Sequence, residues 1–498
     1  MLNTPAILNA FATALSPEYL LITLWATVLG IIIGMLPGLT ATMGLALLTT
    51  LTFQMESFQA ITALLGLYVG AIYGGSRTAI ILNMPGTPAS AATSLDGYPL
   101  ARQSRAREAL GLATIGSFFG TMVGVVLLLF TAPILATYAL KFGTYEYFWL
   151  ALFGVVISGR LTALNDPLKG WIAGFLGLLF AMAGQEQVFA YARFSFGIQD
   201  LTGGISLIPA MVGAFGLVEI LSSISNNQKP KISENKGRLL PKAREVAQNA
   251  GTIGRSGIAG TLMGLIPGVG EDIGAWVSYA IAKRFSRTKE MFGRGSTEGL
   301  IAAETGNSAA VPGAIIPVLT LAIPGSAPSA VLLAALVIHG VQPGPMIMFT
   351  SADMVYGIVA AITLAACVMT VAGVMLTTPL LAVLRIPRER LLPVIFVLCT
   401  VGAFAIAARP FDVWTMLGFG VLGFILKQMD YPMAPLVLGL VLGDLLDKSL
   451  RRGLNLSEGS LEPFLTRPIS AFLAIATLMS LALLLVPTLR RIAKRNNR

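Results

Sequence analysis

Two stretches of the chain carry a Pro-Gly break followed by small hydroxyl residues, and they match position by position when Pro85 is set on Pro324. The matched residues are Gly86 with Gly325, Thr87 with Ser326, and Ser90 with Ser329. Proline removes an amide donor and glycine permits a turn, so each stretch is expected to interrupt a helix. A broken helix leaves free N–H groups, which attract anions, and free carbonyls, which attract cations. A carboxylate and a sodium ion would both find ligands at such breaks.

A second matched pair lies upstream of these breaks. Residues Gly34–Gly38 resemble Gly264–Gly268, and both stretches end in Pro-Gly. Two matched pairs in the same order predict that the chain contains a duplicated unit. A single Pro-Gly in a membrane helix often serves only close packing or a kink. The duplication is what favours a functional site near these motifs.

The composition is that of a membrane protein. Of the 498 residues, 55% are hydrophobic and 12% are charged, whereas soluble domains carry about 25% charged residues. The excess of basic residues lies in short loops between apolar runs, as the positive-inside rule predicts, so the charge of +10 needs no nucleic-acid partner. The basic C-terminal tail is expected on the cytoplasmic side.

Run lengths and loop charges predict an all-α polytopic membrane protein with about 11–12 transmembrane helices. The two halves have opposite charge flanks, which predicts inverted structural repeats, each with a re-entrant, Pro-Gly-broken helical hairpin. The expected parts are a first membrane repeat over residues 18–225, a basic cytoplasmic connecting loop over 226–256, a second repeat over 257–447, and a C-terminal loop, last helix and basic tail over 448–498. Inverted repeats with interrupted segments at matching positions point to the site of a secondary transporter.

Ionisable residues inside apolar runs are functional candidates by default. Arg77 could pair with a substrate carboxylate or neutralise an acidic neighbour, and Glu271, Asp272 and Glu304 could bind a cation or repel a wrong substrate. The same residues could equally lie at a wet tip without a role. Asp96, in Asp-Gly-Tyr-Pro, is expected to form a structural turn.

Catalysis is not favoured by the remaining residues. The two cysteines have no CxxC spacing and His339 is the only histidine, so a zinc or iron site is not expected. Gly74–Ser76 looks like a nucleophile turn, but an intramembrane serine protease would need a base nearby. Asp444 lacks the second carboxylate of an aspartyl protease. We therefore expect no enzyme, no cofactor, and no metal beyond a coupling Na⁺.

Several long motifs in order resemble one known family: Gly34–Gly38, Tyr73–Ser76, Asn83–Ser90, Asp96–Pro99, Gly264–Gly268 and Ile323–Ser326. They are similar to the large membrane subunit, TctA type, of the tripartite tricarboxylate transporter family, over nearly the whole chain. The resemblance implies a multi-pass protein of the bacterial inner membrane. It also implies a small membrane subunit (TctB type) and a periplasmic substrate-binding protein (TctC type) as partners. Transport in the family is coupled to sodium or protons and carries citrate and other carboxylates.

The resemblance also implies roles for the residues on the paired motifs. The hairpin tips would be Pro37, Gly38, Pro267, Gly268 and Gly270. The substrate site would comprise Asn83, Gly86, Thr87, Ser90, Gly325, Ser326, Ser329, Asn307 and Ser308. The cation-binding or gating candidates are Ser76, Arg77, Glu271, Asp272 and Glu304. Tyr73–Ser76 and Thr305–Ser308 are expected at corresponding places in the two repeats.

The resemblance therefore implies a cation-coupled importer of a tricarboxylate or related carboxylate that depends on a binding protein. The repeat would suit an elevator or a rocking motion. A passive channel, or a carboxylate carrier that needs no binding protein, is the alternative from another class.

Overall fold

The computed structural model describes residues 4–36, 39–163, 166–186, 188–224, 239, 241, 243–377, 379, 388–405 and 407–496. The protein is 81% helical, and one sheet lies in the described part, where Gly184 pairs with Arg193 and Gln185 with Ala192. The expectation of an all-α polytopic membrane protein is confirmed. The inverted relation of the repeats in the membrane stays a prediction.

Five helical stretches among the described residues are long and apolar enough to cross a membrane: Pro17–Met35, Ser57–Leu82, Pro88–Ala139, Ala352–Met375 and Pro410–Gln428. Others are apolar but shorter, among them Ala41–Leu51 and Ala327–Ile338. A helix needs about 20 apolar residues to span the hydrocarbon core alone. The shorter helices are therefore of the length expected for halves of broken segments.

The chain packs as two compact units, each made of two separate stretches of sequence: Met1–Thr137 with Ile208–Phe424, and Tyr138–Leu207 with Ile425–Arg498. We call them unit 1 and unit 2. This division by packing differs from the division by sequence repeat, because the Pro-Gly motifs of both expected repeats lie in unit 1 while other parts of each repeat lie in unit 2.

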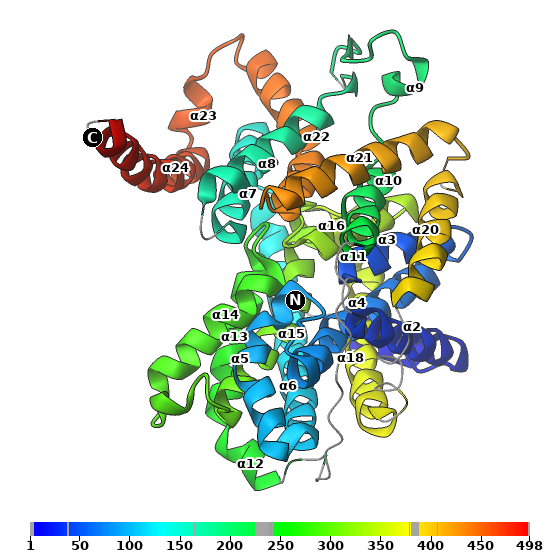
Figure 1. The fold of residues 1–498 in the computed structure, drawn as a ribbon. Helices are drawn as coiled ribbons and strands as arrows, with labels where there is room; N and C mark the ends of the chain where they lie inside the picture. Colours follow the sequence, from blue (N-terminus) through cyan, green and yellow to red (C-terminus); the bar gives the residue numbers. More distant parts are fainter. Residues whose placement is uncertain are drawn as a thin grey trace. The chain divides into compact units, whose positions relative to one another are not determined.

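Unit 1 holds the following elements (Figure 1): α1 (Thr4–Ala14), α2 (Pro17–Met35), α3 (Ala41–Leu51), α4 (Ser57–Leu82), η1 (Pro88–Ser90), α5 (Ala91–Leu100), η2 (Ala101–Arg105), α6 (Ala106–Ala139), α10 (Leu207–Met211), η3 (Val212–Leu217), α11 (Val218–Ile224), α12 (Ala243–Gln248), α13 (Ala250–Leu265), α14 (Gly270–Phe285), η4 (Lys289–Met291), α15 (Thr297–Leu321), α16 (Ala327–Ile338), α17 (Ile347–Thr350), α18 (Ala352–Met375), α20 (Arg388–Ala405) and α21 (Pro410–Gln428). Three of these helices cross the boundary between the units in sequence: α6 ends at Ala139, α10 begins at Leu207, and α21 ends at Gln428.

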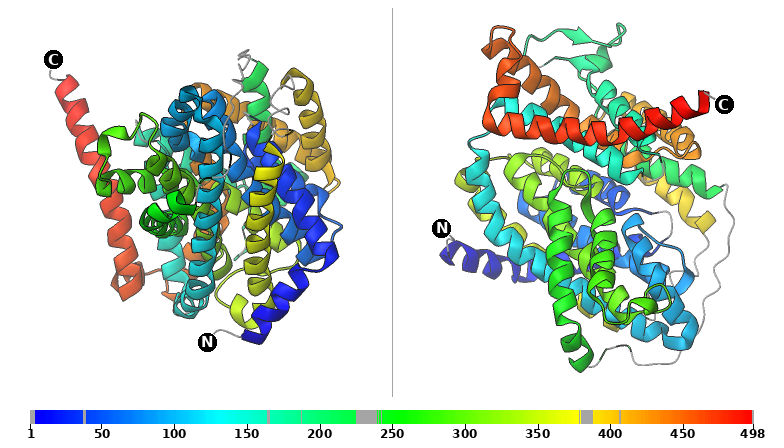
Figure 2. Two further views of the ribbon diagram at one scale, coloured as in Figure 1. Left: turned by 90° about the horizontal axis from the view of Figure 1, so that it is seen from below. Right: turned by 90° about the vertical axis from the view of Figure 1, so that its left-hand side faces the viewer.

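Two central helices, α4 and α15, form the core of unit 1. Every residue from Ala60 to Ile81 of α4 is buried, and so is every residue from Gly299 to Leu321 of α15. A helix that is apolar all round can be stable only when other helices surround it. Helix α2 packs along α4, while α13 and α14 pack along α15. Figure 2 shows α13 and α14 (green) side by side as a hairpin.

The helices of unit 1 begin and end where local sequence dictates. Ser16 precedes Pro17 at the start of α2, a position that tolerates proline because its N–H would have no partner in the helix. At the start of α3 the hydroxyl of Thr40 accepts a hydrogen bond of 3.2 Å from the backbone N–H of Met43. Ser296 caps α15 in the same way, through the N–H of Gly299 at 3.0 Å.

Unit 2 contains α7 (Thr144–Thr162), α8 (Pro167–Ala181), β1 (Gly184–Gln185), β2 (Ala192–Arg193), α9 (Gln199–Thr202), α22 (Met433–Leu456), α23 (Glu462–Thr466) and α24 (Pro468–Asn496). Helices α7, α8 and α22 pack against one another. A methyl group built on Gly177 of α8 would lie 1.9 Å from the carbonyl oxygen of Leu436 on α22, so glycine is what allows this approach. The sequence boundary expected at residue 447 falls inside α22, which continues to Leu456.

Candidate functional site

Glycines at matched positions allow close helix packing in unit 1, between α2 and α4 in its first half and between α13 and α15 in its second half. A methyl group built on Gly34 of α2 would lie 2.0 Å from the carbonyl oxygen of Ala71 on α4. One built on Gly264 of α13 would lie 2.4 Å from that of Ala310 on α15. Both distances are far below van der Waals contact, so only glycine lets these helices approach so closely. The same contact occurs in both halves, and it relates Gly34 to Gly264 and Ala71 to Ala310.

The glycine of each Pro-Gly break is held against the preceding hairpin in the same way. A methyl group on Gly86 would lie 2.0 Å from the carbonyl oxygen of Gly34, and one on Gly325 would lie 2.2 Å from that of Gly264. The two motif pairs found in the sequence are therefore in direct contact within each half. The structure brings each break onto its own hairpin, just before the Pro-Gly tip.

Both long helices end in the left-handed conformation at matched positions. Asn83 ends α4 with φ 53° and ψ 31°, and Ala322 ends α15 with φ 56° and ψ 34°. Asparagine tolerates this region, whereas alanine does so at a cost. Asn83 is exposed, so its visible role is to end the helix, and its expected contact with substrate stays a prediction.

Capping boxes follow both breaks. In the first, the Ser90 hydroxyl donates to the carbonyl oxygen of Thr87 at 2.7 Å and accepts from the N–H of Thr87 at 3.2 Å. In the second, the Ser329 hydroxyl donates to the carbonyl oxygen of Ser326 at 2.9 Å and accepts from its N–H at 2.8 Å. The hydroxyls of Ser90 and Ser329 are therefore engaged in starting their helices. Their contribution to substrate binding stays a prediction.

A polar contact joins the second break to the helix of the first half. The hydroxyl of Tyr68 on α4 donates to Glu271 Oε1 at 2.8 Å and lies 2.9 Å from the Ser326 hydroxyl oxygen. Tyr68 and Glu271 are 0% and 2% exposed, and Glu271 Oε2 has no partner among the described residues. Gly270, at φ 55°, makes room for Ser326, because a methyl group there would lie 2.4 Å from Ser326 Cβ. We call Tyr68, Glu271 and Ser326 the Glu271 cluster.

Glu304 is buried in a cage of hydroxyls. Its Oε1 accepts from the hydroxyl of Thr93 on α5, and its Oε2 accepts from that of Ser117 on α6 at 3.0 Å. The side chain is fully buried, and no ion pair of Glu304 occurs within the described ranges. Ser76, another candidate, donates to the carbonyl oxygen of Tyr73 at 2.5 Å. Glu304 is therefore a carboxylate satisfied by hydroxyls alone.

Asn307 is the least satisfied of the predicted site residues. It is fully buried on α15, and neither its amide nitrogen nor its amide oxygen has a partner in the part of the chain that the structure describes. Ser308 beside it is 3% exposed. Buried amides are normally hydrogen-bonded, so an orphaned one requires an explanation. A ligand that binds at this position would supply one.

Arg77 is buried without a carboxylate partner in the described structure. One guanidinium nitrogen donates to the hydroxyl of Tyr73 at 2.6 Å and to the carbonyl oxygen of Gly373 on α18. Its Nε and its other terminal nitrogen have no partner among the described residues. No acidic side chain in the described structure pairs with Arg77, and two of its nitrogen atoms have no partner there.

The structure describes only one of the two expected hairpin tips. Pro267 and Gly268 lie in the turn between α13 and α14, where Gly268 has φ 74°. Asp272 follows in the first turn of α14. Pro37 and Gly38 lie outside the described residues, between α2 and α3. The helix bounds confirm a break at the three described Pro-Gly positions, which begin at Pro85, Pro267 and Pro324.

The prediction of a turn at Asp96 is wrong, because this residue lies inside helix α5. Its role is nevertheless structural. Asp96 Oδ1 accepts hydrogen bonds from the backbone N–H groups of Gly293, Gly295 and Ser296 at 2.8, 2.9 and 2.8 Å. Tyr279 donates to Oδ2 at 2.9 Å. Its position depends on partners almost two hundred residues away in the chain. The local sequence does not reveal them.

Tyr73–Ser76 and Thr305–Ser308 do not occupy corresponding places. Gly74 packs on the carbonyl oxygen of Ile31, and the matching contact in the second half is that of Gly313 with Thr261. The counterpart of Asn307 is then Tyr68. The sequence reading missed Tyr68 because a single tyrosine in an apolar helix carries no local signal. Extending the alignment of Pro85 with Pro324 upstream along both helices would have revealed the pair.

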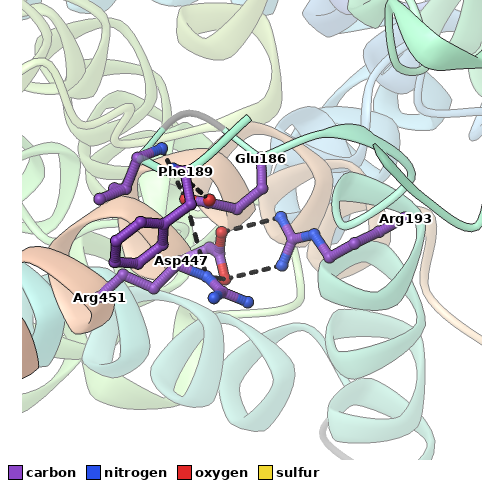
Figure 3. A network of polar contacts seen from close by, with 6 residues as sticks. Glu186, Phe189, Arg193, Asp447 and Arg451 are labelled. Atoms are coloured by element: carbon purple, nitrogen blue, oxygen red, sulfur yellow. Dashed lines mark hydrogen bonds and ion pairs between the residues drawn. The ribbon is translucent and has the colours of Figure 1, made fainter. Parts of the chain in front are cut away.

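Unit 2 has its own polar network, which the sequence analysis did not anticipate (Figure 3). Arg193 on β2 binds Asp447 on α22 through two parallel hydrogen bonds of 3.0 and 2.9 Å. Arg451 Nε lies 3.1 Å from Asp447 Oδ1 and 3.8 Å from Glu186 Oε1. Glu186 also accepts from the N–H groups of Val188 and Phe189, both at 2.6 Å. The network fastens the β1–β2 hairpin to α22.

A cavity of about 170 Å³ lies in unit 2 beside this network. Its charged lining residues are Arg193, Asp444, Asp447 and Lys448. None of the sequence-predicted site residues lines it. The predicted residues gather instead in unit 1, around the two breaks and the central helices.

Comparison with known proteins gives one family and two relatives. The family model described as "Tripartite tricarboxylate transporter TctA family" matches residues 20–438. An uncharacterized 52.8 kDa protein in the TAR-I ttuC' 3' region of Agrobacterium vitis is 36% identical over 481 residues, which cover 96% of each chain. An uncharacterized protein in the TAR-II ttuC' 3' region of the same organism is 34% identical over 231 residues, 46% of this chain and 96% of that protein. No solved structure matches.

Proposed function

Because the chain belongs to the tripartite tricarboxylate transporter TctA family, we propose that it is the large permease subunit of a binding-protein-dependent, cation-coupled importer of a tricarboxylate such as citrate or a related carboxylate. The bacterial inner membrane is its proposed location, with the C-terminus in the cytoplasm. Catalytic activity is not part of this proposal.

The observation that carries the proposal is the duplicated break in unit 1. In each half the glycine of the Pro-Gly break packs on a glycine of the preceding hairpin. A capping box then starts the next helix. Interrupted helices at matching positions are the usual place for substrate and ion sites in secondary transporters. Non-helical backbone at membrane depth is tolerated where it is buried in protein or lines a wet cavity. The two breaks meet the first of these conditions, since Gly86, Thr87, Gly325 and Ser326 are all buried.

The substrate would bind through hydrogen-bond donors near the breaks. Asn307 offers an amide group without a partner in the described structure, and Arg77 offers two nitrogen atoms whose N–H groups have no partner there. A carboxylate accepts hydrogen bonds from both kinds of group. Glu271, Asp272 and Glu304 supply the negative charge that a coupling cation, Na⁺ or H⁺, would neutralise.

Two partners complete the proposed system. A small membrane subunit of the TctB type would accompany this chain, and a periplasmic binding protein of the TctC type would deliver the substrate. The cation gradient then drives inward movement, by an elevator or a rocking motion of the substrate-bearing part.

Reconstitution tests this function directly. Proteoliposomes would hold this chain with its small partner, with and without the binding protein, under a sodium or a proton gradient. Uptake of labelled citrate and of a panel of dicarboxylates is measured in each case. Accumulation that needs both the binding protein and one gradient is the expected result, and it identifies the ion.

Two other outcomes would contradict parts of the proposal. Downhill flux that is indifferent to the gradient and to the binding protein would indicate a passive channel. Gradient-driven uptake that proceeds equally well without the binding protein would indicate an independent carboxylate carrier.

A further inference from the structure

The two halves of unit 1 are alike in backbone packing but differ in the side chains at their breaks. The glycine contacts pair Ala71 with Ala310 and Gly74 with Gly313. On the same alignment, Tyr68 on α4 corresponds to Asn307 on α15. Glu271, in the second hairpin, corresponds to Ala41 in the first. One half therefore contributes a carboxylate, and the matched position of the other contributes a methyl group.

In the Glu271 cluster, the hydrogen bonds leave oxygen lone pairs unused. No side chain of the described residues supplies a positive charge to them. Tyr68 has one hydroxyl proton, which it donates to Glu271 Oε1 at 2.8 Å. The Ser326 oxygen already accepts from the N–H of Ser329 at 3.3 Å and lies 2.9 Å from the Tyr68 oxygen. Glu271 Oε2 is buried with no partner, and no Lys or Arg side chain of the described residues forms an ion pair with this carboxylate. An ionised carboxylate in such a place is costly unless a cation joins it.

Glu304 provides the contrast within the same unit. Both of its oxygens accept hydrogen bonds from hydroxyls, so its carboxylate is satisfied by the protein. Glu271 is only half satisfied. Of these two buried glutamates, Glu271 is the one with an oxygen that has no hydrogen-bond partner among the described residues.

We propose that Glu271, Tyr68 and Ser326 bind the coupling cation, either Na⁺ or a proton, on the unpartnered oxygen of Glu271. This inference rests on the proposed function, because it assigns a binding site to the coupling ion that this function requires. Carboxylate and hydroxyl oxygens are the ligands that hard cations prefer. Asn307 on α15, the position matched to Tyr68, then takes the substrate carboxylate, since an uncompensated Glu271 repels it.

This arrangement accounts for coupling in physical terms. While Glu271 is charged, its field opposes entry of an anionic substrate on α15, against which α14 packs. Cation binding removes this charge and so raises the affinity for the anion. By linkage, the anion raises the affinity for the cation by the same factor.

Cation binding by the purified full-length chain in nanodiscs tests the proposal without substrate or partners. Binding of radioactive sodium is measured for the wild-type chain and for Glu271→Gln, Tyr68→Phe and Glu298→Gln. Glu298 is the matched control, because its oxygens already accept from Thr252 at 2.8 Å and Ser286 at 2.7 Å. We expect Glu271→Gln to abolish binding, Tyr68→Phe to weaken it about tenfold, and Glu298→Gln to leave it unchanged.

A second arm identifies a proton as the ion. If the wild-type protein binds no sodium, its infrared difference spectrum after a pH jump should contain a carboxyl band. Glu271→Gln should remove this band and Tyr68→Phe should shift it. That result supports the site with a proton as its ligand. Sodium binding or a carboxyl band that both variants leave unchanged would overturn the proposal. Tyr68→Phe retains the ring and the charge, so it keeps the test decisive if Glu271→Gln fails to fold.

The test separates the site from the proposed function. Cation binding that depends on Glu271 in a protein whose uptake ignores every gradient would contradict coupled import but not the site. Gradient-driven uptake with unaltered cation binding in both variants would contradict the site alone.

Discussion

Asp96 on α5 and Tyr279 on α14 share a hydrogen bond of 2.9 Å, although 183 positions separate them in the chain. The other oxygen of Asp96 accepts from three backbone N–H groups of the loop that leads into α15. One carboxylate thus joins the segment after the first break to the helices of the second half. The breaks are held in place by such contacts as well as by the glycine packing.

The first prediction concerns this carboxylate. Asp96→Asn keeps the size of the side chain but loses its charge, and it puts a donor where an acceptor is needed. Hydrogen bonds to charged groups contribute more than neutral ones, so we expect the free energy of unfolding to fall by about 2–3 kcal/mol. Tyr279→Phe removes a single bond and should cost about 1 kcal/mol. Unfolding of the purified protein in detergent measures both, and equal stability of Asp96→Asn and wild type would refute the role.

A second prediction tests the glycine contacts at the breaks. Gly86→Ala and Gly325→Ala place a methyl group 2.0 and 2.2 Å from a backbone carbonyl oxygen, so the break must move away from its hairpin. Overpacking of this kind costs about 1–3 kcal/mol, and we expect loss of uptake together with a lower Tm. Gly254→Ala on α13 is the control, because its methyl group meets nothing within 4 Å. A Gly86→Ala protein with wild-type Tm and uptake would contradict the packing argument.

The sequence predicted the breaks because their signal is local. Proline and glycine act on their own backbone, so Pro85, Pro267 and Pro324 could be assigned without knowing what surrounds them. The sequence failed where tertiary partners decide. Asp-Gly-Tyr-Pro resembles a turn, but its aspartate lies in a helix, where it binds a distant loop.

The same difference between local signals and tertiary partners applies to the site residues. Glu271 and Glu304 could be named from sequence because charges are rare in apolar runs. Tyr68 and Thr93 could not, since a tyrosine or threonine in a membrane helix is unremarkable until its partner is known. The difference between a satisfied Glu304 and a half-satisfied Glu271 depends on hydroxyls from other helices, which no local pattern reveals.

A third prediction concerns the network of unit 2. Burial alone would raise the pKa of Asp447, but hydrogen bonds from Arg193 and Arg451 lower it below its ordinary value. Asp447 lies on α22, which is not among the helices apolar enough to cross a membrane. A lowered pKa in the folded state means that the network stabilises the protein above the ordinary aspartate pKa, about 3.9. This stability is lost as the pH falls through the lowered value.

Hydrogen exchange of the β1–β2 hairpin measures the effect. We expect Asp447→Asn to speed exchange between residues 184 and 198 at neutral pH, and to abolish the acid-induced increase that the wild-type protein shows. Asp200→Asn, an exposed change beyond the hairpin, should alter neither. Equal exchange in Asp447→Asn and wild type at neutral pH would show that the ion pairs do not hold the hairpin.

The last prediction separates function from stability at Asn307. Its buried amide has no partner in the described structure, so Asn307→Ala removes a polar group whose burial is unfavourable without a ligand. We expect the Tm to stay equal or rise, because unsatisfied buried polar groups are destabilising. If the amide binds the substrate carboxylate, the KM for uptake should rise about tenfold or more. Thr320→Val is the matched control, since Thr320 is buried on the same helix but its hydroxyl donates to Ile316 of its own helix at 2.8 Å. A lower Tm with an unchanged KM in Asn307→Ala would mean that the amide serves the fold and not the substrate.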